Sequence, residues 1–306
     1  APISDKWAFG FGISSGYNAQ SDWGGDNSVS PVATDTQIST YQVSTDLAYA
    51  PWKQFSFGAG YDFVRVMVEG YDYDSPTSSP YDTDLSGDSW DTAWHAGALF
   101  QIDETTRIGA AYHSKVDYKA VGSASTISQD GEALQETGDF GFTSVLPAYS
   151  VLSAYRQLNT KWAMQASVSY TQWDQINEIE YDNLPTDTSL ENVNQEYDYQ
   201  NTWRSAVGAH YLISPTLMLR FGLAYETSPY NNDEVYLQAP PGNSYDASIG
   251  LHVVTSTAWA FDFGWTHIFY DDLNVDTSND INDATSTGDF SGNSDIIGLQ
   301  AVWNMT

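Results

Sequence analysis

Residues 203–226 read WRSAVGAHYLISPTLMLRFGLAYE, and this stretch decides the fold. It contains two runs in which every second residue is apolar, separated by a tight turn at 214–216. Strict alternation of this kind is the mark of a β-strand with two different faces. The pattern recurs along the chain and predicts about twelve antiparallel strands of ~9–14 residues, the length that a tilted strand needs to cross a bilayer.

The connections between the expected strands alternate in length. Tight turns fall at 51–54, 103–106, 158–161, 214–216 and 255–257. Long polar loops are expected at 17–36, 72–90, 119–145, 180–199, 228–244 and 271–293. Short turns at one end and long loops at the other are typical of bacterial outer-membrane barrels, whereas a soluble β-sandwich has no reason for this asymmetry. The sequence therefore predicts an all-β protein, a transmembrane antiparallel up-and-down barrel that occupies residues 1–306 as a single domain.

Aromatic residues make up 15% of the chain although the mean hydropathy is polar, at −0.39. Rings gather near strand starts beside tight turns and again further along the strands, as two interfacial girdles would require. The residues concerned are Trp7, Trp162 and Trp259, then Tyr49, Tyr112, Tyr170 and Tyr225.

The apolar phase changes within the run that starts at Phe55. Odd-numbered residues are apolar up to Phe63, but from Val64 to Val68 the even-numbered residues include the valines. An extra residue in one strand shifts the phase in this way, so we expect a β-bulge near Phe63.

The opposite face of the strands carries small residues with a few polar and charged ones, which suits a barrel lumen better than a solvent-facing surface. The alternative is a soluble β-sandwich, whose outward face would be rich in charge. The polar lumen residues expected on this basis are Arg204, Arg220, Glu226, Asp262, His113 and His210.

The charge balance excludes some partners. The chain has 40 acidic and 10 basic residues, a net charge of −30, so it lacks the cations that a nucleic-acid partner requires. Most of the acids fall in the expected long loops, where the default interpretation is a solvated surface and the alternative is binding of divalent cations. No loop has the spacing of a calcium site, since Ile281 stands where the loop beginning at Asp276 would need glycine.

Catalysis finds little support in the sequence. His113 and Ser114 are the only adjacent histidine–serine pair, and neighbours on a strand point to opposite faces. With no cysteine there is no thiolate chemistry and no Cys-based zinc site. We expect no enzyme activity, no catalytic residues, no cofactor and no metal.

Several stretches spread over nearly the whole chain resemble a known family. They are Phe9-Gly10-Phe11-Gly12, residues 55–60, residues 94–100, Leu146-Pro147, Tyr170-Thr171 with Trp173, and Arg220-Phe221-Gly222 with Thr227-Ser228-Pro229. In these elements the chain resembles the FadL/TodX family of outer-membrane transporters for long-chain fatty acids and hydrocarbons. The resemblance implies a fourteen-stranded barrel with an N-terminal hatch. The hatch and about two strands of that pattern are not in this sequence, which is then either a trimmed portion or a barrel that closes with twelve.

The resemblance also implies a transport route. Family members capture the ligand in an apolar groove between extracellular loops and release it sideways at an inward kink in one strand. The corresponding exit here would be Gly10, Gly12, Ser14, Ser15 and Gly16. The corresponding ligand contacts would be Ile127, Leu134, Phe140, Phe142, Val145 and Leu146, with Tyr73 and Trp90 from the facing loop.

The function expected from this resemblance is passive transport of a hydrophobic compound across the outer membrane of a Gram-negative bacterium. The implied partners are the hydrophobic ligand, the lipid bilayer and lipopolysaccharide, with divalent cations at the acidic loops as an alternative. A general or sugar-selective porin is the second hypothesis, suggested by the acidic loops and polar lumen. A barrel-embedded hydrolase is the third.

Overall fold

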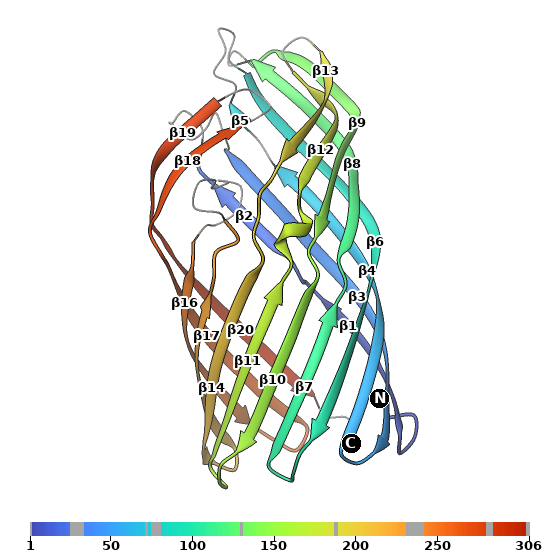
Figure 1. The fold of residues 1–306 in the computed structure, drawn as a ribbon, viewed down its shortest axis with the longest axis vertical. Helices are drawn as coiled ribbons and strands as arrows, with labels where there is room; N and C mark the ends of the chain where they lie inside the picture. The colour runs from blue at the N-terminus through green and yellow to red at the C-terminus, as the bar shows by residue number, and fades with distance from the viewer. Residues whose placement is uncertain are drawn as a thin grey trace.

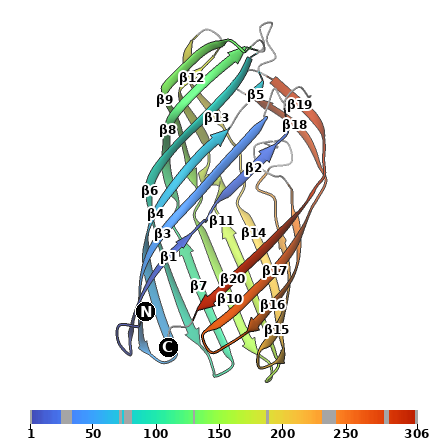
Figure 2. The same cartoon turned by 180° about the vertical axis from the view of Figure 1, so that it is seen from behind.

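The computed structural model of the chain describes residues 2–24, 34–70, 73–74, 81–128, 131–186, 189–230, 242–279 and 284–303. The described strands are tilted and surround a common axis (Figures 1 and 2). We call the end with the tight turns, at the bottom of Figure 1, the turn end, and the opposite end the extended end. None of the helical segments in the described ranges is long and apolar enough to cross a membrane.

Twelve of the described strands form a continuous antiparallel wall, in which each strand pairs with the next. They are β1 (Trp7–Ser14), β3 (Asp35–Trp52), β4 (Phe55–Gly70), β6 (Tyr81–Gln101), β7 (Thr106–His113), β10 (Tyr149–Gln157), β11 (Trp162–Thr171), β14 (Thr202–Ser214), β15 (Leu217–Glu226), β16 (Ser244–Val254), β17 (Trp259–Tyr270) and β20 (Asn293–Trp303). The strand pattern expected from alternation is therefore confirmed. Among the described residues no pairing joins β1 to β20, so the wall has two free edges and does not close with twelve strands.

The long polar connections are largely not loops, which corrects the sequence-based expectation. They contain all or most of β2 (Asn18–Asp22), β5 (Tyr73–Asp74), β8 (Val116–Ser128), β9 (Ala133–Leu146), β12 (Glu178–Pro185), β13 (Leu190–Glu196), β18 (Leu273–Asn279) and β19 (Ala284–Phe290). A short 3-10 turn η1 (Trp173–Gln175) lies between β11 and β12. Several of them, among them β8, β9, β12 and β13, extend the wall beyond the strands of the turn end (Figure 1).

The exterior of this extension is polar and charged. Asp117 and Lys119 point outward from β8, and Lys119 forms an ion pair of 2.5 Å with Asp182 of β12. The hydrogen bond that Lys119 donates to Asp182 raises the pKa of Lys119. Charges paired in this exposed setting indicate that the extension stands in water rather than in lipid.

The wall below the extension carries two bands of outward-facing aromatic pairs. Trp7 with Tyr49 and Trp162 with Tyr211 lie toward the turn end, with ring centroids 4.5 and 4.7 Å apart. On β11, Tyr170 lies eight residues beyond Trp162, about 26 Å along the strand at ~3.3 Å per residue. Other pairs of this second band are Trp94–Tyr112, Tyr170–Trp203 and Tyr225–Tyr245. Two girdles flanking an apolar band are what a membrane-spanning barrel requires.

The change of phase in β4 is not a bulge. The pairing of β4 with β3 runs without a shift from Phe57 to Gly70, and that with β6 from Phe55 to Glu69. Phe57 and Phe63 point outward and are each 48% exposed, whereas Val66 points inward and is fully buried. β4 stays regular while the environment of its two faces changes along its length. Toward the extended end, the outward face passes from lipid to water, and the inward face passes from the polar lumen to an apolar interior.

The apolar interior at the extended end forms what we call the outer compartment. Its inward-facing side chains are buried against one another, in contrast to the open lumen at the turn end. It consists of Val64, Val66, Val68, Leu85, Ala93, Val116, Tyr118, Ala120, Ala124, Phe140, Phe142, Leu146, Ile179, Tyr181, Leu184, Tyr197 and Tyr230.

Candidate functional site

The pairing of β1 is interrupted by a kink at 15–17, which joins it to β2. Ser14 pairs with Gln42, and pairing resumes with Asn18 opposite Ser39. The three residues 15–17 therefore lie opposite only two residues of β3, 40 and 41. An extra residue of this kind makes a β-bulge and bends the strand. The ladder of main-chain hydrogen bonds between β1 and β3 is therefore broken here.

The side chain of Thr40 replaces the missing ladder contacts. Its hydroxyl accepts the backbone N–H groups of Tyr17 at 2.9 Å and Gly16 at 3.2 Å, and donates to the carbonyl of Tyr17 at 2.7 Å. In return, the Ser15 hydroxyl donates to the Thr40 carbonyl at 2.6 Å. Because Thr40 is only 1% exposed, buried hydrogen bonds hold the kink in a defined shape.

The side chain of Tyr17 crosses the lumen from the kink. Its hydroxyl donates to the carbonyl of Pro147 at 2.6 Å, and its ring meets those of Tyr149 and Trp173 edge-on. Pro147 lies two residues before β10, which is separated from β1 by four strands of the wall. The kink thus points inward and is tied to the opposite side of the barrel.

The kink lies at the base of the outer compartment. Thr40, which holds the kink, pairs with Val66 of β4, a fully buried member of the compartment. Asp62 lies on the same strand, two inward-facing residues from Val66 toward the turn end, and is the first charged residue of the lumen. The bend in the wall therefore coincides with the junction between the apolar and the polar interior.

A layer of charged and imidazole groups lies directly below this junction. The His95 ring lies between two carboxylates, with Nδ1 2.8 Å from Asp62 and Nε2 2.6 Å from Asp46. The Ser44 hydroxyl donates to the other oxygen of Asp62 at 2.6 Å. His113 stacks on His95 with ring centroids 5.0 Å apart, so Asp46, Asp62, His95 and His113 form what we call the polar layer.

A glycine makes the polar layer possible. Gly60 of β4 pairs with Asp46 on one side and with His95 on the other, so the two side chains must meet across it. A Cβ at position 60 would lie 2.3 Å from a carbon of the His95 ring and 2.7 Å from Asp46. Only glycine leaves room for this contact.

The expected exit residues lie beside the kink. Phe9 and Phe11 point outward, 44% and 65% exposed, while Gly10 and Gly12 lie on the lumen face. A Cβ at Gly12 would meet nothing within 4 Å, whereas one at Gly10 would come within 2.9 Å of Asp46. The remaining expected exit residues are Ser14, which ends β1, and Ser15 and Gly16, which lie in the kink itself.

The expected ligand contacts are only partly brought together. Phe140, Phe142 and Leu146 lie in the outer compartment, and Ile127, Leu134 and Val145 are half-buried on β8 and β9. Trp90 does not contribute to the compartment: the alternation of β6 turns it outward, 63% exposed. Tyr73 belongs to β5, and its side chain lies outside the described part of the structure.

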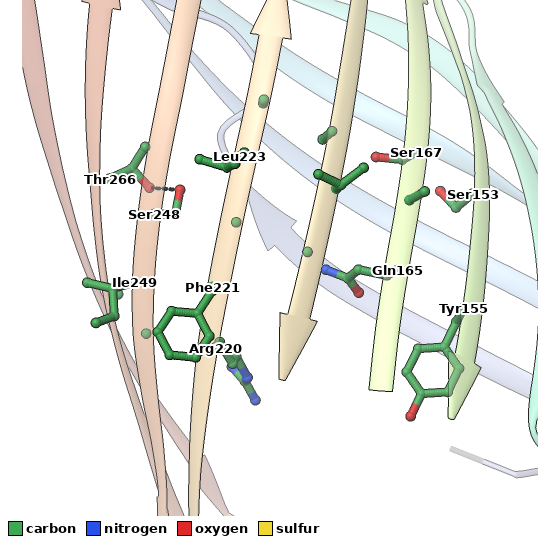
Figure 3. A pocket seen from close by; sticks show the side chains of 18 of the residues that line it. Ser153, Tyr155, Gln165, Ser167, Arg220, Phe221, Leu223, Ser248, Ile249 and Thr266 are labelled. Carbon is green, nitrogen blue, oxygen red and sulfur yellow. Dashed lines mark hydrogen bonds between the residues drawn. The ribbon is translucent and has the colours of Figure 1, made fainter. Parts of the chain in front are cut away.

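The polar residues expected in the lumen line it at different heights. Arg220 and Asp262 lie toward the turn end, whereas Arg204 lies next to Trp203 of the second aromatic band. A cavity of about 750 Å³ is lined by Arg204, Arg220 and Asp262, and Figure 3 shows Tyr155, Gln165 and Arg220 around it on three different strands. Short ion pairs balance the charges: Arg204–Asp246 and Arg220–Asp262, each 2.6 Å, and His252–Asp262 at 2.9 Å, with Glu226 3.5 Å from Arg204. His210 lies beside the Tyr155 ring, and His113 belongs to the polar layer. This lumen suits water and polar solutes.

The sequence analysis missed Tyr17, Thr40, Asp46 and Asp62. The two aspartates carried a usable signal, since an acid on the lumen face of an expected membrane strand must find a partner. Tyr17 carried none, because its partner Pro147 lies 130 residues further along the chain.

Solved structures share this fold. A Pseudomonas aeruginosa FadL homologue superposes with a TM-score of 0.89 at 22% identity, covering 99% of this chain and 76% of that one. The Pseudomonas putida toluene transporter TodX gives a TM-score of 0.76 at 15% identity, covering 99% of this chain and 80% of that one. Both comparisons support the barrel architecture.

Sequence relatives point the same way. Outer membrane protein P1 of Haemophilus influenzae is 26% identical over 306 residues, which is 90% of this chain but only 62% of the relative. The long-chain fatty acid transport protein of Salmonella typhi is 24% identical, over 88% of this chain and 68% of its own. The model of the family described as outer membrane protein transport protein (OMPP1/FadL/TodX) matches residues 1–304. The chain therefore belongs to this family of outer-membrane transport proteins of Gram-negative bacteria.

Proposed function

We propose that the protein is a passive transporter of hydrophobic compounds, of the long-chain fatty acid or hydrocarbon class. The observation that carries this proposal is the position of the kink, at the junction of the apolar outer compartment with the polar layer. The relatives' names, a long-chain fatty acid transport protein and a toluene transporter, support the same class of ligand.

Capture would take place in the outer compartment. Transfer of an alkyl chain from water into apolar surroundings is favourable by about 0.8 kcal/mol per methylene group. The compartment's side chains, such as Phe140, Phe142 and Val66, are fully buried against one another. A ligand would have to part them, so entry requires rotation of side chains at the extended end.

Release would take place sideways at the kink. Straight passage would bring the ligand from Val66 down to Asp62, His95 and Asp46, where it would separate paired charges or enter water. Neither offers an apolar solute any gain. At the kink, by contrast, main-chain pairing of β1 is already broken, and a Cβ added at Gly12, on the lumen face beside the kink, would meet nothing within 4 Å.

A second candidate function, a sugar-selective porin, is favoured by the cavity of about 750 Å³ with its paired charges. The buried outer compartment argues against it, because a polar solute would have to cross that compartment first. The two candidates differ in solute: liposomes containing the transporter should take up an alkylbenzene or a long-chain fatty acid but should not swell rapidly in sugar.

Filling the exit tests the proposal. Gly12→Trp places a bulky ring in free space beside the kink, and the expected result is a folded barrel whose fatty acid uptake falls at least several-fold. Thr45→Trp on β3 is the matched control, because Thr45 pairs across from Phe11 on the outward face. Uptake at the wild-type rate by a folded Gly12→Trp protein would refute lateral release at this position.

A further inference from the structure

The polar layer contains a set of side chains that the transport route does not need. The ligand atoms of Asp62, His95 and His113, one from each residue, all lie within 4.8 Å of one another. We propose that these residues form a binding site for a divalent transition-metal ion of the zinc class.

The donor set determines the class of ion. Two imidazoles and one carboxylate suit Zn²⁺, Ni²⁺ or Cu²⁺, whereas Ca²⁺ and Mg²⁺ prefer oxygen ligands throughout. Zinc–nitrogen and zinc–oxygen bonds are about 2.0–2.2 Å, so the ligand atoms have to draw together by roughly 1 Å or more, within the reach of side-chain rotation. Three protein ligands leave the fourth tetrahedral position to water.

The groups that would orient the ligands of such a site are already present. Metal-bound histidines usually donate their other ring N–H to a carboxylate, which fixes the ring and makes it a better ligand. Asp46 stands 2.6 Å from His95 Nε2, so Nδ1 is the nitrogen left for an ion. The ion would take the place of the hydrogen that joins Nδ1 to Asp62. Ser44 holds the far oxygen of Asp62 and orients the carboxylate.

His113 supplies the observation that distinguishes this cluster from an internal ion pair. Its ring stacks between His95 and Tyr149, at centroid distances of 5.0 and 4.4 Å. No described residue hydrogen-bonds either of its ring nitrogens, although the Asp62–His95 pair lies beside it. A ring that is fixed by stacking and keeps a free nitrogen is a preformed ligand. The three ligands come from β4, β6 and β7, which are consecutive in the wall, so an ion would tie three strands together.

Cobalt(II) is the probe that tests the proposal, since four-coordinate Co²⁺ with nitrogen ligands absorbs visible light strongly and Co²⁺ on exposed carboxylates does not. Detergent-solubilised protein, freed of metal with a chelator, is expected to bind one Co²⁺ with strong absorption, which Zn²⁺ then displaces. His113→Gln should abolish the absorption without unfolding the barrel, because no hydrogen bond is lost. His252→Gln is the matched control, as this histidine also faces a lumen aspartate but lies on the far wall.

Zinc should also raise the temperature at which wild-type protein loses its folded gel mobility, but not that of the His113→Gln variant. Three results would overturn the proposal: no strong absorption in the wild type, equal absorption in His113→Gln, or equal stabilisation of both proteins by zinc.

Discussion

Replacing Thr40 by valine removes the hydroxyl that holds the kink while keeping the shape of the side chain. The hydroxyl makes three contacts of 2.7 to 3.2 Å with the backbone of Tyr17 and Gly16. Gly16 is exposed, so its N–H group can turn to water, but the N–H and carbonyl of Tyr17 are partly buried. The substitution therefore leaves two polar groups without their partner.

The magnitude follows from those two groups. Each buried polar group left unsatisfied costs about 1–3 kcal/mol, so the kinked conformation loses roughly 2–6 kcal/mol relative to a regular strand. A loss of about 2 kcal/mol changes the ratio of the two conformations by roughly 30-fold, since about 1.4 kcal/mol corresponds to tenfold. The remaining wall keeps its pairing, so the barrel is expected to stay folded while uptake falls by about tenfold or more.

The assay is uptake of a labelled long-chain fatty acid by liposomes that contain equal amounts of folded protein. Thr45→Val is the matched control: it lies on the same strand, and its hydroxyl makes only a 3.4 Å contact with the Tyr61 carbonyl. If the Thr40→Val protein folds and transports at the rate of the control, the kink does not determine transport and the reasoning fails.

Three further substitutions test separate parts of the structure. Gly60→Ala is expected to push His95 away from Asp46 and to lower the free energy of unfolding in urea by about 1.5–3 kcal/mol, whereas Gly264→Ala, where an added Cβ meets nothing within 4 Å, should leave it nearly unchanged. Tyr17→Phe removes the 2.6 Å hydrogen bond to the opposite wall, so proteolysis at the kink should become faster; unchanged cleavage would mean that this bond does not hold the kink. Phe142→Ala leaves a cavity in the outer compartment and should destabilise the barrel by about 3–5 kcal/mol; a loss below 1 kcal/mol would show that the compartment is not packed as described.

The wall could be predicted from the sequence because lipid and lumen impose opposite demands on alternate residues. Runs such as 203–226 carry that signal plainly, and the structure pairs them as expected. The sequence predicts loops in place of the extension because its outward residues, for example Lys119 and Asp182, are basic or acidic like those of a loop. Their inward neighbours Ala120 and Tyr181 carry the alternation that identifies a strand.

The site could be predicted only in outline. Alternation cannot distinguish a bulge from a change of surroundings, which is why it predicts a bulge near Phe63 where the structure has regular pairing. The exit was located by family resemblance, and the residues that shape it depend on contacts that are distant in sequence. Tyr17 with Pro147, and Asp46 with His95, meet only because of the strand order of the folded wall.

The central claim is that a hydrophobic ligand leaves the barrel at the kink and does not pass through the polar layer. A long-chain fatty acid with a photoreactive diazirine in its alkyl chain tests this most directly, with adducts on the wild-type protein mapped by mass spectrometry. The account predicts adducts on the outer compartment, such as Phe142, and on residues 14–17, but none on Leu99, which lines the lumen below the polar layer. Adducts on Leu99 without adducts on residues 14–17 would contradict it.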